Sequence, residues 1–190
     1  MSTYTAEESF HHRDFATEGV TAKEFADCHF TSCSFATVDL SNIRFLDCHF
    51  TDCDLSNARL SGTSFQQASF KNCKLLGLAF EDCDRLGFAV DFTGCQLEHA
   101  SFFQMKLVRS AFHDCNLTGT DLTEADLVGA ALTGCDLSRV TFDRTNLQKA
   151  DLRGSYHYQI DPTTNRVKGA RFSLPEVAGL LTSFGIRLDD

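Results

Sequence analysis

A bulky apolar residue recurs at every fifth position along most of this chain. Between Gly119 and Phe142, the sequence GTDLTEADLVGAALTGCDLSRVTF places Leu or Phe at positions 122, 127, 132, 137 and 142, and a smaller residue lies two positions before each. A period of five fits neither the 3.6-residue period of an amphipathic helix nor the alternation of a half-buried strand. The pattern therefore predicts a repeat architecture.

The repeat runs from Phe10 to Leu152 with one interruption. Fifteen consecutive units end at Phe80, the register slips by two residues, and 13 more units begin at Phe92. In each unit the bulky residue and the one two positions before it are expected to face inward. The two extra residues predict a bulge near 85–87, interpreted either as a simple kink of the shaft or as a protrusion that contacts a partner.

The cysteines support the same interpretation independently. All nine lie two positions before a bulky slot, and they form two series with a spacing of 20 residues: Cys33, Cys53, Cys73 and then Cys95, Cys115, Cys135. A spacing of 20 over a unit of five means four units in each turn of a coil, so that identical side chains stack in successive coils. The 28 units then make seven coils, joined as parallel strands about 4.8 Å apart.

The first coil departs from this rule. Its inward slots hold Glu8, Arg13, Glu18 and Lys23, four charges of alternating sign. Such groups cannot be buried in an apolar shaft, so we expect them to turn toward water or to pair with one another. This end of the repeat is therefore predicted to face solvent, as terminal repeats do.

The last residues predict a helix. Ser173 followed by Glu176 matches a capping box, Pro175 suits a first turn and Gly185 suits the position after a helix end, which places the helix at about 174–184. We expect residues 1–154 to form the repeat domain and residues 155–190 to cap it.

The apolar residues of this tail exceed what one coil end needs. We expect a two-fold homodimer in which helix and edge strand are exchanged, with a monomeric end cap as the alternative. The predicted dimer interface consists of Leu174, Val177, Leu180, Leu181, Phe184, Ile186 and Leu188.

Units such as ADLVG at 125–129 and CDLS at 135–138 resemble the pentapeptide-repeat family over residues 8–154. The resemblance implies an all-β fold, a right-handed quadrilateral β-helix. The ending RFSLPEVAGLLTSFGIRLDD is similar to the termini of the topoisomerase-protecting group of that family, the Qnr-, MfpA-, AlbG- and McbG-like proteins, and CKLLG at 73–77 resembles the albicidin-immunity branch. The sequence departs from the Qnr type because it lacks two sizeable loops.

Candidate chemistry is sparse. Cysteine spacings of 5 and 20 differ from the clustered spacing of metal sites, so the cysteines are interpreted as small buried hydrophobic residues. His29 and His49 are expected to stack on an outer face, where they either bind adventitious metal or have no role. Ser110, His113 and Asp114 are neighbours, but no cleft, phosphate loop or metal motif accompanies them. We therefore expect no enzyme activity, no metal and no cofactor.

Composition and net charge restrict the class of partner that this protein can bind. There is no signal peptide and no apolar run long enough to cross a bilayer, which predicts a soluble, cytoplasmic protein. The net charge of −9 argues against direct binding to nucleic acid or to an anionic membrane, and favours a basic protein surface.

Acidic residues without Lys or Arg between them occupy the stretch from Ser110 to Leu137. These acidic residues either simply keep a rod-shaped protein in solution or form a face that imitates duplex DNA. The resemblance implies binding to DNA gyrase or topoisomerase IV and resistance or immunity to a quinolone, albicidin or related toxin. The runner-up is a scaffold with another partner, and a β-helical enzyme comes third. The predicted partner-binding residues are Asp114, Asp121, Glu124, Asp126 and Asp136, followed by Glu81, Asp82 and Asp84.

Overall fold

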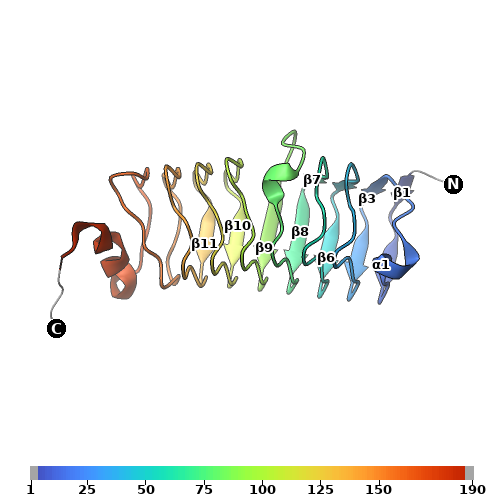
Figure 1. Cartoon of the computed structure of the whole chain (residues 1–190), viewed down its shortest axis with the longest axis horizontal. Helices are drawn as coiled ribbons and strands as arrows, with labels where there is room; N and C mark the ends of the chain where they lie inside the picture. The colour runs from blue at the N-terminus through green and yellow to red at the C-terminus, as the bar shows by residue number, and fades with distance from the viewer. Residues whose placement is uncertain (1–3, 187–190) are drawn as a thin grey trace.

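The computed structural model describes residues 4–186, which form an elongated shaft of stacked coils (Figure 1). Parallel strands pair in two sheets along the shaft. The four-stranded sheet is made of β1 (Tyr4–Ala6), β3 (Glu24–Ala26), β5 (Arg44–Leu46) and β7 (Ser64–Gln66). The seven-stranded sheet is made of β2 (Ser9–His11), β4 (His29–Thr31), β6 (His49–Thr51), β8 (Ala68–Lys71), β9 (Val90–Thr93), β10 (Ala111–His113) and β11 (Ala131–Thr133).

Each coil has four sides, which we call A to D. Side A carries the four-stranded sheet and continues through bridges between Lys106, Asp126, Asn146 and Arg166, and side B carries the seven-stranded sheet. Side C is connected by bridges from Asp14 through Lys74 to Tyr156, and side D by bridges such as Ser101 to Asp121. The predicted class, an all-β solenoid of parallel strands, is confirmed.

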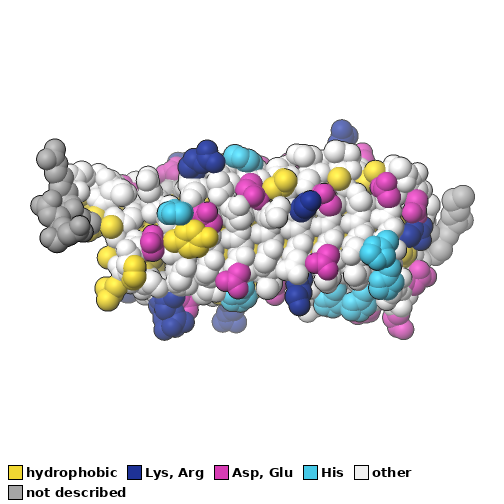
Figure 2. Space-filling view, turned by 90° about the horizontal axis from the view of Figure 1, so that it is seen from below, with side chains coloured by type: hydrophobic (Ala, Val, Ile, Leu, Met, Phe, Trp, Pro, Cys, Tyr) yellow, Lys and Arg dark blue, Asp and Glu magenta, His cyan; other side chains and the backbone are white. Residues whose placement is uncertain are grey.

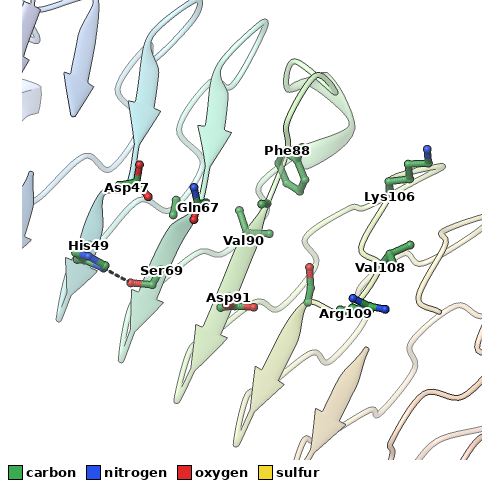
Figure 3. A pocket seen from close by; sticks show the side chains of 13 residues that line it. Asp47, His49, Gln67, Ser69, Phe88, Val90, Asp91, Lys106, Val108 and Arg109 are labelled. Atoms are coloured by element: carbon green, nitrogen blue, oxygen red, sulfur yellow. Dashed lines mark hydrogen bonds between the residues drawn. The ribbon is translucent and has the colours of Figure 1, made fainter. Parts of the chain in front are cut away.

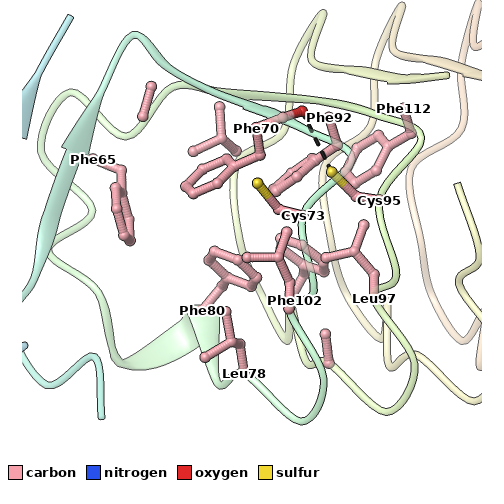
Figure 4. Packing of buried hydrophobic residues seen from close by; sticks show 14 of the residues in the cluster. Phe65, Phe70, Cys73, Leu78, Phe80, Phe92, Cys95, Leu97, Phe102 and Phe112 are labelled. Carbon is pink, nitrogen blue, oxygen red and sulfur yellow. Dashed lines mark hydrogen bonds between the residues drawn. The ribbon is translucent and has the colours of Figure 1, made fainter. Parts of the chain in front are cut away.

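The core consists of the predicted inward pairs. Phe30, Phe50 and Phe70 stack with ring centroids 4.8 Å apart, and Phe45 meets Phe50 edge to face at 5.4 Å. The same column continues through Phe92 and Phe112, with ring centroids 5.3 and 5.0 Å apart (Figure 4). Offset stacks and edge contacts of this kind add stability beyond the apolar area that they bury. The core is therefore a set of aromatic columns parallel to the shaft axis.

The nine cysteines are buried and free, as predicted. Their thiols also have a polar role: the Cys53 thiol donates to the carbonyl oxygen of Phe30 at 3.4 Å, 23 residues earlier. Thr63, at an equivalent inward position, donates to Leu40 in the same way at 2.8 Å. Burial raises the pKa of Cys48 to about 12, so this thiol stays protonated at neutral pH.

The first coil turns its charges outward, as predicted. Glu8, Arg13, Glu18 and Lys23 are exposed, and Arg13 pairs with Glu18. A short helix, α1 (Phe15–Glu18), occupies this position, and the Asp14 side chain accepts a hydrogen bond from the Ala16 amide at 3.0 Å.

The predicted bulge is also present. The register between β8 and β9 shifts by two residues, so that Phe70 lies beside Phe92. The short helix η1 (Phe80–Asp82) precedes the bulge, Cys83 stays buried, and residues 85–87 project from the shaft (Figure 1).

The predicted α-helix at the C-terminal end is wrong in type. The segment forms two 3-10 helices, η2 (Leu174–Leu180) and η3 (Thr182–Phe184), and only the left-handed Gly185 ends it as expected. The capping-box residues bind the preceding coil instead: the Ser173 hydroxyl accepts from Gly154 N at 2.9 Å, and Glu176 accepts from His157 N at 3.1 Å. Ile186 lies in no strand, and Leu188 lies outside the described residues.

Candidate partner-binding surface

Candidate functional residues in the part of the chain that the structure describes lie on the outer surface of the shaft, because buried apolar side chains fill its interior. Within residues 4–186, no group of three or more His, Cys, Asp or Glu side chains is placed to hold a metal ion. His29 and His49 stack as predicted, with ring centroids 4.9 Å apart. No helix in this range combines the length and the apolar character that crossing a bilayer requires.

The acidic run from 114 to 136 does not form one face. Asp114 follows β10 at a corner, Asp121 lies on side D, Asp126 on side A and Asp136 on side C, while Glu124 lies at the corner between sides D and A. The reason is geometric, because a stretch of just over 20 residues winds once around a coil. The structure therefore separates the side chains that the sequence grouped.

Three of these acids bind the backbone of their own turn. The carboxylate of Asp121 accepts from Thr123 N at 2.8 Å, Asp126 from Val128 N at 3.3 Å and Asp136 from Ser138 N at 3.0 Å. This is the Asx turn, in which a side-chain oxygen replaces a backbone acceptor. The signal was present in the sequence, because Asp or Asn recurs directly before the bulky residue.

Glu124 and Asp136 also interact with side chains of neighbouring coils. Glu124 pairs with Arg144 at 2.9 Å and accepts from the Gln104 amide at 2.7 Å. Partial burial acts to raise the pKa of Asp136, but hydrogen bonds from Ser138 and the nearby His157 outweigh it and lower the pKa. These carboxylates are thus partly engaged within the shaft.

The second predicted group lies beside the bulge. Glu81 and Asp82 belong to η1, and the Asp84 carboxylate accepts from Leu86 N at 3.0 Å. One carboxylate oxygen of Glu81 is buried and has no hydrogen-bond partner among the described residues, whereas Asp82 and Asp84 are exposed. The structure places these acids next to Leu86, whose exposed fraction is 78%.

A groove of about 420 Å³ lies at the corner between sides A and B, next to the bulge (Figure 3). Asp47 and His49 line one end of it, Phe88 and Val90 the middle, and Lys106 and Arg109 the other end. His49 and Ser69 are joined by a hydrogen bond of 2.6 Å, and Asp91 accepts from Ala111 N at 2.7 Å. Sequence reasoning missed this groove because it depends on how the bulge folds against neighbouring coils.

The C-terminal segment exposes apolar side chains at one end of the shaft (Figure 2). Of the predicted interface residues, Leu174 is 86% exposed, and Val177, Phe184 and Ile186 are also exposed. Leu180, in contrast, packs against the core of this chain. The predicted set therefore divides into residues that close the coil and residues that remain uncovered.

Comparison with known proteins agrees with this architecture. The family described as "pentapeptide repeat region" matches residues 23–102 and 88–161. No match was found among curated proteins.

Solved structures of QnrB1, described as a plasmid-mediated fluoroquinolone resistance protein, share the fold. Two trypsin-treated variants give TM-scores of 0.66 and 0.64 at 19% and 17% identity; the matches cover 100% and 98% of this chain and 98% and 100% of theirs. Full-length QnrB1 gives a TM-score of 0.55 at 18% identity, and the match covers 96% of this chain and 100% of QnrB1. With the five-residue period, the four-sided coil and the family match in agreement, this chain belongs to the pentapeptide-repeat family.

Proposed function

We propose that this protein mimics DNA, binds a type II topoisomerase in the cytoplasm, and protects the cell against an antibiotic or toxin that targets this enzyme. The proposal rests on shape and charge together: the protein is a shaft of parallel coils and has a net charge of −9. The fold is shared along its whole length with a fluoroquinolone resistance protein, which adds support. The partner is DNA gyrase or topoisomerase IV, and the protein acts by binding rather than by catalysis.

The imitation of DNA is coarse. Duplex DNA carries one charge per about 1.7 Å of its axis, whereas acidic side chains are scattered along the face seen in Figure 2. Several carboxylates are also occupied by turns of the shaft, such as that of Asp121. A sparse negative field still steers association with a basic groove, so shape and net charge support the proposal better than any single acid does.

The active form in this proposal is a homodimer joined through the C-terminal segment. Uncovered apolar side chains at that end, Leu174 and Phe184 among them, support a second copy as the cover. A two-fold dimer would carry −18, twice the −9 of one chain. Replacing Leu181 and Phe184 by polar residues is expected to halve the mass measured by light scattering.

The function is tested by a gyrase supercoiling assay with and without the protein at matched salt, run in parallel with quinolone, albicidin and microcin. We expect the protein to alter supercoiling or drug-induced cleavage at micromolar concentration. Absence of any effect on supercoiling, cleavage or toxin action would instead favour a scaffold with a different partner.

A further inference from the structure

The groove beside the bulge has opposite charges at its two ends. Asp47 lies at the end nearer the N-terminus, and Lys106 and Arg109 lie at the other end (Figure 3). Between them Phe88 and Val90 provide an apolar wall, and Val108 is 45% exposed. Asp91 also lines the groove, where its carboxylate accepts from Ala111 N at 2.7 Å. From Asp47 past Phe88 and Val90 to Lys106 and Arg109, the groove offers a cation subsite, an apolar wall and an anion subsite in a fixed order along the shaft.

Charged residues of the same sign as each end of the groove continue along this corner of the shaft, acidic toward the N-terminus and basic toward the C-terminus. Glu7, Asp27 and Asp47 occupy successive coils before the bulge, and Arg109 and Lys149 occupy the same corner after it. Across residues 4–186, none of these five side chains forms an ion pair or a side-chain hydrogen bond. Most other arginines of the shaft are paired, as Arg44 is with Glu24 and Arg144 with Glu124. The corner thus keeps its charges available to a partner.

The backbone fixes these side chains in place. Asp27, Asp47 and Arg109 all have left-handed backbone conformations, with φ of 51°, 50° and 63°. Their amides donate to carbonyl oxygens of the next coil at 3.0, 2.9 and 3.1 Å, so each side chain projects from the corner in the same way. Like charges stacked in neighbouring strands repel one another, so folding stability alone does not account for this ladder.

The distance between the acidic and basic ends of the groove sets the spacing of the charges on a segment that could bind in it. Asp47 and Arg109 are separated by three coil spacings, which is about 14 Å at about 4.8 Å per spacing. An extended segment rises about 3.3 Å per residue, so its matching charges would lie about four residues apart. Such a segment would carry Lys or Arg at one end, Asp or Glu at the other, and an apolar side chain between them.

We propose that this groove is where the topoisomerase docks, through a segment that presents a basic, an apolar and an acidic side chain in that order. The inference rests on the proposed function and identifies the contact surface for it. Because the two ends of the groove differ in sign, the segment lies in only one direction, and the orientation of the shaft on the enzyme is fixed. The surrounding acidic field brings the partner close, and the groove sets the register.

The test measures the affinity of the full-length protein for purified gyrase by biolayer interferometry at low and physiological salt. Asp47→Arg and Arg109→Asp reverse the two ends, using residue types that these left-handed corners already accommodate. Asp52→Arg and Arg139→Asp are the controls for charge reversal, because both residues are exposed and occupy left-handed corners, with φ of 54° and 56°, away from the groove. Asp52 also accepts from the Asn72 side chain at 3.3 Å, so circular dichroism is recorded for this variant too.

We expect each groove variant to weaken binding about five- to tenfold and the double variant roughly 25- to 100-fold, since effects at separated sites are nearly additive. The controls should stay within about twofold, and added salt should reduce the difference. Should a reversal impair folding by circular dichroism, Asp47→Asn and Arg109→Gln replace it, with the same direction of effect.

The outcomes separate the two proposals. Groove variants that bind gyrase as tightly as the unmodified protein, or controls that weaken it equally, overturn the docking site and leave the proposed function intact. Absence of binding by the unmodified protein to purified gyrase and also to purified topoisomerase IV, measured in the same way, overturns both.

Discussion

Aspartate and asparagine residues directly before the bulky slots bind the backbone of the turn that follows. Asp54 accepts from Ser56 N at 2.9 Å, and Asn116 accepts from Thr118 N at 3.0 Å in the same position of another coil. Because the neutral Asn serves as well as Asp, the hydrogen bond rather than the charge is the structural requirement. The turns therefore require an oxygen acceptor at these positions but not its negative charge.

Substitutions at Asp121 should separate these two roles. Asp121→Asn keeps the acceptor for Thr123 N and is expected to change the free energy of unfolding by less than about 0.5 kcal/mol, whereas Asp121→Lys removes it and should cost about 1 kcal/mol. Thermal denaturation followed by circular dichroism measures both. Asp27→Lys is the control, because Asp27 lies at an exposed corner and its carboxylate caps no turn. Equal melting temperatures for the Asp121 variants would refute the turn role.

The same hydrogen bonds predict how stability depends on pH. A side-chain hydrogen bond from Arg153 lowers the pKa of Asp151, and hydrogen bonds from Ser41 lower that of Asp39. A carboxyl with a lower pKa in the folded state contributes stability that is present above its unfolded pKa, about 3.9, and is lost as the pH falls through the folded value. We expect the free energy of unfolding in urea to decrease below about pH 4, and Asp151→Asn to reduce that dependence. A free energy that stays constant from pH 5 to pH 2 would contradict this account.

At the scale of the elements, most corners of the coils are left-handed residues whose amides bond to the next coil along the shaft. Many side-chain types occupy such corners, and glycine is needed mainly where the neighbouring coil comes close. A Cβ at Gly77 would lie 2.7 Å from Oδ1 of Asn57, and one at Gly62 would meet Asn42 at the same distance. The corners therefore differ in steric demand although their backbones are alike.

Gly77→Ala and Gly129→Ala test this difference. Both glycines have φ of 65°, but the added carbon at Gly129 would only reach Cγ of Arg109, at 3.8 Å. Gly129→Ala should cost about 1–2 kcal/mol from the left-handed backbone alone, and Gly77→Ala should cost more because Asn57 must also move. Urea denaturation gives both values, and equal costs would show that the Asn57 side chain yields freely.

The C-terminal segment is held to the shaft by a close backbone approach. Ile160 N donates to the Gly179 carbonyl at 3.0 Å, and a Cβ at Gly179 would lie 2.1 Å from the carbonyl oxygen of Tyr158. Because a backbone atom cannot move aside as a side chain does, residue 179 has to be glycine for η2 to dock. The element depends on the shaft more than on its own helical propensity.

Gly179→Ala should therefore release the segment without unfolding the coils. We expect faster chymotrypsin cleavage after Leu181 or Phe184 and a melting temperature of the shaft close to that of the unmodified protein. Gly185→Ala is the control for backbone strain without a clash, since Gly185 has a φ of 63° and nothing lies within 4 Å of the carbon that the substitution adds. A segment that remains resistant in Gly179→Ala would mean that η2 docks differently.

For the molecule as a whole, the five-residue period was sufficient to predict the core and the parallel coils, because each inward slot depends only on position within the unit. The period also located the bulge, as Phe70 and Phe92 show by pairing across a shift of two residues. It did not predict which outward residues meet, because that depends on the side and coil that each residue occupies. Asp126 and Asp136 were grouped by sequence but lie on sides A and C of the shaft, and the groove between Asp47 and Arg109 joins residues 62 positions apart. The capping box at Ser173 failed for a related reason, since the preceding coil takes up both of its side chains.

The first coil is expected to be less stable locally than the middle of the shaft. A solenoid is held together by contacts between neighbouring coils, so a coil with a poor core opens more readily than the rest. In the first coil the inward slots of Glu8, Arg13, Glu18 and Lys23 contribute no buried side chain, whereas a middle coil buries Cys48, Cys53, Ala58 and Thr63 in the corresponding positions. Hydrogen exchange followed by mass spectrometry should show fastest exchange in strands β1 and β2, and slowest exchange in β6, β8 and β9. Arg13→Ala, which offers an inward side chain without charge, should slow exchange in β2 and leave β9 unchanged; uniform exchange along the shaft would instead mean that all coils open together.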